Sequence, residues 1–403
     1  MIHMKKQKSR IAYGLITAFI LLLNIVAWNS TGFCDWYIAH IFPIWVNTWG
    51  RVTGLFPFSV GEWLIAAGLL ILSVAVVLGL LWAAAGIMKI FAKKTVLGRV
   101  IRFVKGYYRF FAWTVLIVCL IMTLNCFILY HASTFSEHYF GEEKEEYTLE
   151  ELIAVYNRVA ENCNRLAEQM ERDETGMVLY TGSTGSLGDA AYGEQLRDMA
   201  DQCRKLMQQL GQEYEQLDGW YPRPKAMLFS DFMCQQHMQG YYFPFSMEAN
   251  YNDVMHILNI PSTMCHELAH LRGYIYEDEA NFIGYLACVQ SEDAFIEYAG
   301  YLSVLNYLYN DLYKAWQTER TAYEAAMEKI HPVAVSEQVW EDNTFVSDEE
   351  WERINGKALI DTETVDKAAD ILVDANLKVN GVSDGKISYS RVVKLLLQYY
   401  CPQ

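Results

Sequence analysis

Three uncharged apolar runs occupy the first third of the chain. They cover about residues 11–28, 63–87 and 111–130. Each is close to the roughly 20 residues that a helix needs to cross ~30 Å of hydrocarbon. No convincing small-residue cleavage site follows the first run, which favours an uncleaved span over a signal peptide. The pattern therefore predicts a membrane anchor of three transmembrane helices within residues 1–131.

Beyond residue 131, apolar positions recur mostly at helical spacing. Two amphipathic segments, about 147–172 and 192–216, predict a helical hairpin within residues 132–219. Thr148 followed by Glu151 is a capping-box pattern at the start of the first segment. Aromatic residues with Pro and Gly dominate from about 220 to 252 and predict strands or extended segments. Residues 331–403 predict a helical C-terminal subdomain.

Charge divides the chain at the same place. Residues 1–131 hold twelve Lys/Arg against two acids, whereas the rest holds 20 Lys/Arg against 46 acids. Seven of the basic residues lie in the loop expected at 89–109, and four lie in the first ten residues. Because cytoplasmic loops are enriched in Lys/Arg, this predicts a multi-pass plasma-membrane protein with a cytoplasmic N-terminus and an extracytoplasmic domain after residue 131. The acidic domain argues against nucleic acid as a partner, and the lipid bilayer is the expected one.

The clearest chemistry lies in His266, Glu267 and His270, which form an HExxH motif. Pro261 and Gly273 bracket a predicted helix, in the positions that helices favour for these residues. On that helix the two His are at i and i+4, so both imidazoles lie on one face, roughly 6 Å apart at their roots, and can share one zinc ion. Glu267 flanks the metal and is suited to take a proton from a zinc-bound water.

A catalytic zinc site needs a third protein ligand and keeps one position open. An unbroken helix would carry an acid seven residues past His270 ~10 Å along the axis, so Gly273 must let the chain turn first. The next segment offers Glu277 and Glu279, which point to different sides of a helix. Glu277 shares its face with Asn281, whose amide can orient a ligating imidazole. Glu277 is therefore the preferred third ligand, and Glu279 is the alternative.

Further side chains are candidates for supporting roles. The weak candidates for stabilising the oxyanion of a tetrahedral intermediate are Tyr298, Tyr301 and His237. Residues 240–252 predict either an ordinary core strand or an edge strand that pairs with a substrate backbone. Cys163 and Cys203 lie on the two helices of the predicted hairpin and could form a disulfide bond. His256 lies in an apolar run and is interpreted as structural.

Several blocks carry a resemblance to a known family. They are HELAHLRGYIYEDEANFIGYLAC at 266–288, GYYFPFSMEANYN at 240–252, EYAGYLSVLNY at 297–307 and ISYSRVVKLLL at 387–397. Together with the three apolar runs, they resemble a bacterial membrane family catalogued as domain of unknown function 3810. The E-x-x-A-N at 277–281 looks like the third-ligand motif of gluzincin peptidases, in which the first Glu binds zinc. The metzincin pattern fails, because Tyr276 stands where that family has its third His.

The fold expected is mainly α: three N-terminal transmembrane helices, then a zincin-like α+β extracytoplasmic domain, mostly helical with a small sheet. Its metal-binding core is expected at residues 220–330. The function expected is zinc-dependent hydrolysis of a peptide or protein substrate, with Glu267 as general base. The alternative is a non-catalytic binding or sensing module that keeps zinc on a zincin scaffold. An open metal site would favour catalysis, and a closed four-ligand site would favour binding.

Overall fold

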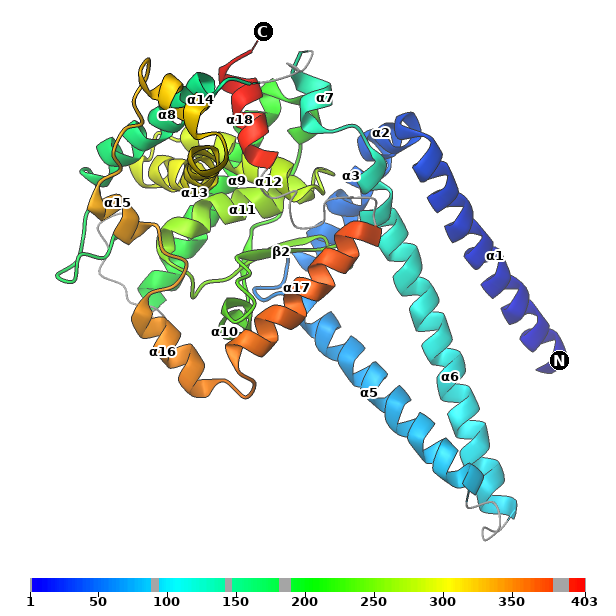
Figure 1. Cartoon of the computed structure of the whole chain (residues 1–403). Coiled ribbons are helices and arrows are strands. Elements are labelled where there is room, and N and C mark those ends of the chain that lie inside the picture. Colours follow the sequence, from blue (N-terminus) through cyan, green and yellow to red (C-terminus); the bar gives the residue numbers. More distant parts are fainter. Residues whose placement is uncertain (1, 88–93, 142–146, 181–189, 380–390, 403) are drawn as a thin grey trace.

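Three long helices project from a mostly helical globular part in the computed structural model (Figure 1). The structure describes residues 2–87, 94–141, 147–180, 190–379 and 391–402. The projecting helices are α1 (Ile2–Asn29), α5 (Val60–Ile87) and α6 (Lys94–Met122), the last continued by η3 (Thr123–Phe127) and η4 (Leu129–His131). Within them, Gln7–Asn29, Val60–Ala84 and Val100–His131 are long and apolar enough to cross a membrane. The expectation of three apolar N-terminal helices is confirmed.

The basic segment at 89–109, expected as a loop, is mostly helical. α6 begins at Lys94 and runs without a break into the third apolar run, and residues 88–93 lie outside the described residues. Leu, Val, Ile and Phe alternate with the basic residues at helical spacing, so one helix carries both. In Figure 1 the N-terminal end of α1 and the adjoining ends of α5 and α6 point away from the globular part.

The segment between the first two spans packs into the globular part. It folds as α2 (Thr31–His40), α3 (Phe42–Trp45), the π-helical turn η1 (Val46–Gly50) and α4 (Arg51–Thr53). Cys34, Tyr37 and Phe42 are buried and belong to one hydrophobic core that extends through the globular part as far as Leu397. The end of the anchor and the globular part therefore share a single core.

The long helices of the globular part pack around the helix that carries the HExxH motif. α8 (Leu149–Ala167) lies along α13 (Ala294–Thr318), while α9 (Ala190–Glu213) lies against α11 (Ile260–His270) and α12 (Glu277–Val289). The two helices expected within 132–219 are present, but each buries its apolar face on a different partner, so they do not pair as the expected hairpin. Cys163 and Cys203 are accordingly free and buried, and the disulfide bond considered between them is absent.

Shorter elements complete the described part of the globular region. Before α8 and after α9 lie α7 (Phe135–Tyr139) and η5 (Glu215–Leu217). After α13 come α14 (Arg320–Met327), α15 (Glu337–Asp342), α16 (Asp348–Lys357), α17 (Thr362–Val379) and α18 (Val392–Tyr400). α18 returns to pack on α12, α13 and α8, so the end of the chain closes the same core. The helical character expected after residue 331 is seen in these elements.

A small sheet lies between α11 and the anchor. Its strands are β1 (Lys225–Ala226), β2 (Gly240–Phe243) and β3 (Glu248–Tyr251), with α10 (Ser230–Cys234) after β1 and η6 (Ile257–Asn259) before α11. The strand order is β1–β3–β2, with β1 parallel and β2 antiparallel to β3. The aromatic block at 240–252 therefore forms an edge strand, a turn and the central strand. The extended segment expected around residue 230 is instead the helix α10.

Buried charges join this sheet to the second span. Lys225 of β1 donates to Glu248 of β3 and to two backbone carbonyls ahead of α5. Glu248 in turn accepts from the first two backbone N–H groups of α5. On the other side, Glu62 in the first turn of α5 accepts from the backbone N–H groups of Leu228 and Phe229. The span and the sheet are thus held by reciprocal hydrogen bonds, and the position of one fixes the other.

Lys225→Met is expected to lower the free energy of unfolding by about 3–5 kcal/mol, because it leaves the Glu248 carboxylate buried without its counterion. Denaturant unfolding of the purified protein in detergent, followed by tryptophan fluorescence, measures this. Lys367→Met is the matched control, since the Lys367 ion pair with Glu363 is exposed and should contribute little. Equal stabilities of the two variants would contradict a structural role for the buried pair.

Candidate metal centre

Helix α11 carries the HExxH motif and ends where the motif ends. Pro261 occupies its first turn, where a missing N–H costs no hydrogen bond, and His270 is its last residue. Gly273 then takes a φ of +92°, and a Cβ there would lie 3.0 Å from Cγ2 of Ile38 in α2. Both conditions favour glycine. The chain reverses at this point and α12 returns along α11, so the predicted helix and glycine turn are confirmed.

The two imidazoles of the motif lie together, with ring centroids 4.7 Å apart and planes at 88°. Nδ1 of His270 lies 2.6 Å from the carbonyl oxygen of Tyr274, and because a carbonyl only accepts, this Nδ1 carries the proton. Nδ1 of His266 lies 2.9 Å from Oδ1 of Asn281 and donates in the same way. In the neutral form of each ring, Nε2 is then the nitrogen with the free lone pair. The supporting position expected for Asn281 matches this geometry.

Glu277 reaches both imidazoles from the first turn of α12. Its Oε2 lies 3.0 Å from Nε2 of His266 and 3.9 Å from Nε2 of His270. Two ligands held ~2.1 Å from a tetrahedral zinc lie ~3.4 Å apart, which falls between these two distances. The Glu279 carboxylate turns away, because it is buried and accepts from the backbone N–H of Phe135. Of the two acids considered as third ligand, Glu277 is the one beside the imidazoles.

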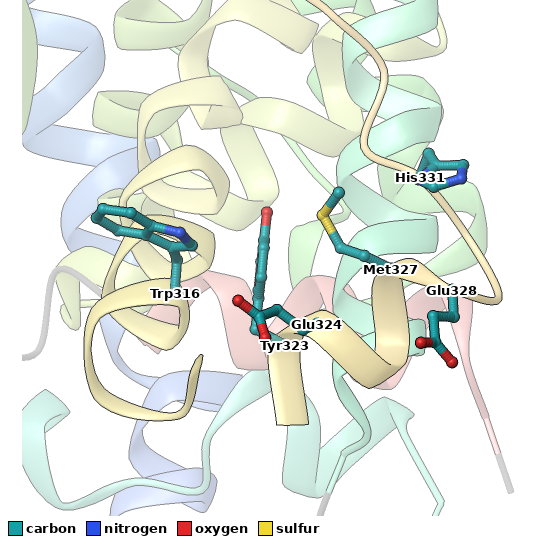
Figure 2. Close-up of a pocket in the computed structure, with 6 residues that line it drawn as sticks. All are labelled: Trp316, Tyr323, Glu324, Met327, Glu328 and His331. Carbon is teal, nitrogen blue, oxygen red and sulfur yellow. The ribbon is translucent and has the colours of Figure 1, made fainter. Parts of the chain in front are cut away.

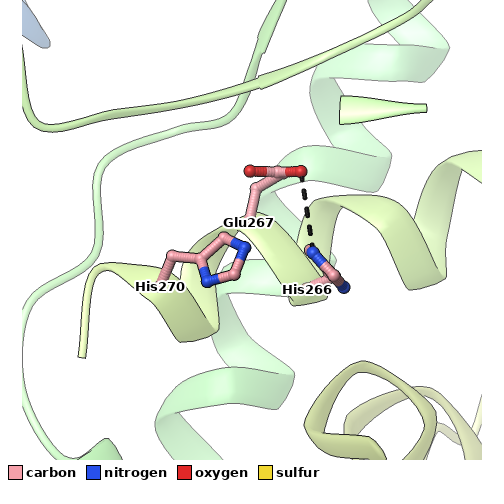
Figure 3. A group of neighbouring side chains, drawn as sticks. All are labelled: His266, Glu267 and His270. Atoms are coloured by element: carbon pink, nitrogen blue, oxygen red, sulfur yellow. Dashed lines mark ion pairs between the residues drawn. The ribbon is translucent and has the colours of Figure 1, made fainter. Parts of the chain in front are cut away.

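Glu267 lies under strand β2, next to the two imidazoles (Figure 3). Its Oε1 is 3.9 Å from Nε2 of His266, and its Oε2 is buried without a hydrogen-bond partner among the described residues. β2 passes so close that a Cβ on Gly240 would overlap this carboxylate. Burial raises the pKa of Glu267 to about 8, although the charge of His266 opposes the rise. A carboxyl in this state suits proton transfer near neutral pH.

Burial and mutual charge set the protonation of the other three groups. Burial opposes charging of His266, but the Glu277 carboxylate at its Nε2 outweighs burial and raises the pKa of His266. Burial, together with the neighbouring His266, lowers the pKa of His270 to about 4. For Glu277, burial alone would raise the pKa, and the hydrogen bond from His266 lowers it instead. The Glu277 carboxylate therefore favours the charged form of His266, whereas burial favours the neutral form of His270.

This donor set fits a zinc ion. Two imidazole nitrogens and one carboxylate oxygen are ligands that zinc uses in open sites with three protein ligands. The donor atoms of His266, Glu267 and His270 also lie within 4.8 Å of one another. Nε2 of His266 nevertheless lies 3.0 Å from Glu277 and 3.9 Å from Glu267. Glu277 is thus the nearer of the two carboxylates to Nε2 of His266.

The three side chains considered as oxyanion stabilisers have partners elsewhere. Tyr298 donates to a carboxylate oxygen of Asp342 at 2.7 Å. Tyr301 is buried and packs edge-on against a tyrosine ring of α12. His237 is exposed, with Nδ1 2.9 Å from a carboxylate oxygen of α17. We assign none of them a role in the cluster. His256, interpreted as structural, is buried, and burial lowers its pKa to about 4.

Two tyrosines beside the cluster were not singled out from the sequence. The hydroxyl of Tyr307 in α13 lies 3.5 Å from Nδ2 of Asn281. Burial, with the nearby Glu277 charge, raises the pKa of Tyr307. The ring of Tyr242 in β2 lies 5.8 Å from the ring of His270. No local pattern marks these two among the 27 tyrosines, because only the packing of α13 and β2 against α11 and α12 brings them here.

A separate apolar depression lies at the end of α13 (Figure 2). Its volume is about 280 Å³ and it is lined by Trp316, Tyr323, Glu324, Met327, Glu328 and His331. In Figure 2 these side chains come from the last turns of α13, from α14 and from the segment that follows it. The depression shares no residue with the HExxH cluster, so it gives no indication of what the cluster binds.

One protein-family model matches the chain over residues 37–397, and it describes a "Protein of unknown function (DUF3810)". The match includes the segment ahead of the second span, the sheet, the HExxH helix and most of α18. No curated protein and no solved structure matches the chain. Because the family model covers most of the sequence, from the end of the first span almost to the C-terminus, the chain belongs to the DUF3810 family, as its sequence blocks indicated.

Proposed function

We propose that this chain is a zinc metallopeptidase, anchored in the plasma membrane and active on its outer side. The observation that carries this proposal is the convergence of two imidazole nitrogens and the Glu277 carboxylate beside the unpartnered buried oxygen of Glu267. The orientation rests on charge, because the basic ends of α1 and α6 point away from the globular part and Lys/Arg favour the cytoplasmic side. The globular part is then extracytoplasmic.

Each residue of the cluster has a role in amide hydrolysis. Zinc bound by His266, His270 and Glu277 would polarise the scissile carbonyl and lower the pKa of the attacking water. Glu267 would take the water proton on its free oxygen and deliver it to the leaving amine. Asn281 holds His266 in the tautomer whose Nε2 can bind a metal, and the Tyr274 carbonyl does the same for His270. Both groups therefore act by positioning a ligand.

Strand β2 offers a place for an extended peptide beside these groups. It is an edge strand that pairs with β3 alone among the described strands. In an antiparallel pair, only every second residue of a strand hydrogen-bonds to the partner strand. The backbone N–H of Asn252 donates to the carbonyl of Gln239, so Gln239 is one of the bonded residues. The backbone groups of Gly240 and Tyr242 therefore point away from β3. Because Gly240 lies directly against Glu267, a peptide paired with these groups would pass the metal donors.

A non-catalytic zinc module is the competing interpretation. Such a module closes its metal with a fourth protein ligand, usually Cys or His. The nearest cysteine in sequence, Cys265, directs its Sγ toward the backbone of Cys203, on the far side of α11 from the imidazoles. The described donor set therefore supports three ligands and an open position, which favours hydrolysis.

Glu267→Gln is expected to lower peptide hydrolysis by about 10²-fold or more and to leave zinc bound, because Gln fills the same space but accepts no proton. The measurement is cleavage of a peptide library by the detergent-purified full chain, together with elemental analysis of zinc. Glu279→Gln is the matched control, since it removes another buried carboxyl and should keep both zinc and activity. A wild type that holds zinc and cleaves nothing, or a variant that cleaves equally well, would count against the peptidase.

Zinc affinity should separate the two acids of α12. Glu277→Gln is expected to lose most of the affinity, because it removes a charged ligand, while Glu279→Gln should keep it. Asn281→Ala should weaken zinc binding by about 10–100-fold, since it frees one imidazole to turn. Competition with a chelator of known zinc affinity measures all three. If Glu279→Gln loses zinc while Glu277→Gln retains it, the assignment of the third ligand is wrong.

A further inference from the structure

Large apolar side chains are exposed next to the point where α5 leaves the globular part. Leu228, Phe229 and Phe232, in and before α10, are 68%, 60% and 50% exposed. Their place relative to the membrane is fixed, because Glu62 in the first turn of α5 accepts from the backbone N–H groups of Leu228 and Phe229. The candidate span on α5 starts at Val60. These three side chains therefore lie level with the start of a span.

Two other loops expose apolar residues around the same place. The loop that leads into α5 carries Leu55, Phe56 and Phe58, which are 82%, 44% and 38% exposed. The loop before α17 carries Leu359 and Ile360, and it adjoins α10 because the Gln235 side chain donates to the carbonyl of Ile360. We call these eight residues the apolar rim: Leu55, Phe56, Phe58, Leu228, Phe229, Phe232, Leu359 and Ile360. Exposed apolar side chains that three separate loops bring together indicate an interaction surface.

Three charged groups beside the apolar rim have partners within the protein. Asp231 of α10 forms a two-pronged ion pair with Arg353 of α16. Lys225 pairs with Glu248 under the loop that leads into α5. Glu62 is occupied by two backbone N–H groups. The exposed side chains in and before α10 can therefore enter an apolar layer while these three groups keep their partners, and the continuity of the apolar rim with the span points to lipid as that layer.

We propose that the apolar rim is seated in the outer headgroup layer of the bilayer, and that the substrate is the membrane-proximal stretch of another membrane-anchored polypeptide. This substrate class rests on the proposed peptidase function. It follows from where β2 runs. Phe243, at one end of β2, packs against Gly61 at the start of α5, and Gly240, at the other end, lies against Glu267.

Strand β2 thus extends from the start of α5, at the membrane end of the globular part, to the Glu267 carboxylate. Three residue steps at ~3.3 Å place Gly240 about 10 Å along the strand from Phe243. An extended polypeptide paired with β2 would pass from the lipid surface to the metal donors over that distance. Cleavage is then expected about 3–6 residues from the point where the substrate leaves the bilayer. Free peptides in bulk solution would lack this alignment.

The position of the apolar rim is tested with fluorescent probes on the full chain in phosphatidylcholine–phosphatidylglycerol vesicles, after Cys119→Ser and Cys401→Ser. A probe on Phe229→Cys should be quenched by nitroxide-labelled lipid headgroups and protected from aqueous iodide, with Leu228→Cys as a second position. A probe on Trp340→Cys should show the reverse, because Trp340 is exposed on α15, away from the spans (Figure 1). Iodide quenching of the Phe229 probe, or protection of it from both quenchers as under a protein partner, would overturn the proposal.

The substrate class is tested in the same vesicles with a pool of peptides, offered either free or tethered to a lipid through spacers of increasing length. Tethered peptides with short spacers should be cut faster than the same peptides free or on long spacers. Equal rates for free and tethered peptides would overturn the substrate class while leaving the peptidase intact. Cleavage of neither would contradict the peptidase itself, and the probe readings would still decide where the apolar rim lies.

Discussion

Glu277 can meet the two imidazoles only because the chain reverses between α11 and α12. A continuous helix would carry position 277 about 10 Å beyond His270 along the axis. The reversal depends on Gly273, whose positive φ and close contact with Ile38 leave no room for a side chain. The same turn brings the Tyr274 carbonyl to Nδ1 of His270, so one local geometry positions the Glu277 carboxylate and orients the His270 imidazole. The meeting of these two side chains depends on this turn.

The turn is itself held by residues next to the apolar N-terminal helices, and this couples the HExxH cluster to those helices. Ile38 belongs to the segment between the first two spans, and Glu279, one turn into α12, is held by the backbone of Phe135, just after the third. The sheet over α11 is joined to α5 through Lys225 and Glu248. The anchor is therefore part of the scaffold that shapes the site, and the globular part is built upon its outer end.

The local parts of this arrangement could be predicted from the sequence, and the long-range parts could not. The i, i+4 spacing of His266 and His270, and the position of Gly273, fix one helix and its end, and the angle between Glu277 and Glu279 on the next helix decides which of them faces the imidazoles. The hydrogen bond between the Tyr274 carbonyl and His270 could not be predicted from the sequence, because every residue has a backbone carbonyl. The proximity of Tyr307 depends on the path of α13, which no spacing reveals.

Two of the mistaken expectations have related origins. α8 and α9 were expected to pair because they are consecutive and amphipathic, but amphipathic spacing shows that a face is buried without showing what buries it. The basic segment before the third span was expected as a loop because its charge interrupts the apolar run. A helix tolerates such charges at the edge of a membrane, where Lys and Arg side chains can extend into water. In the first case the helices were predicted but their packing partners were not, and in the second case the charges were taken to end a helix that continues through them.

X-ray absorption at the zinc edge of the purified full chain would measure the ligands of the HExxH cluster. The expected result is one bound zinc with two imidazole nitrogens and carboxylate or water oxygens at about 2.0–2.2 Å, and no sulfur. This ligand set corresponds to His266, His270 and Glu277 with one position open. A chain that purifies without metal and takes none up, or a spectrum with sulfur at about 2.3 Å, would contradict the assignment of this cluster as an open zinc centre.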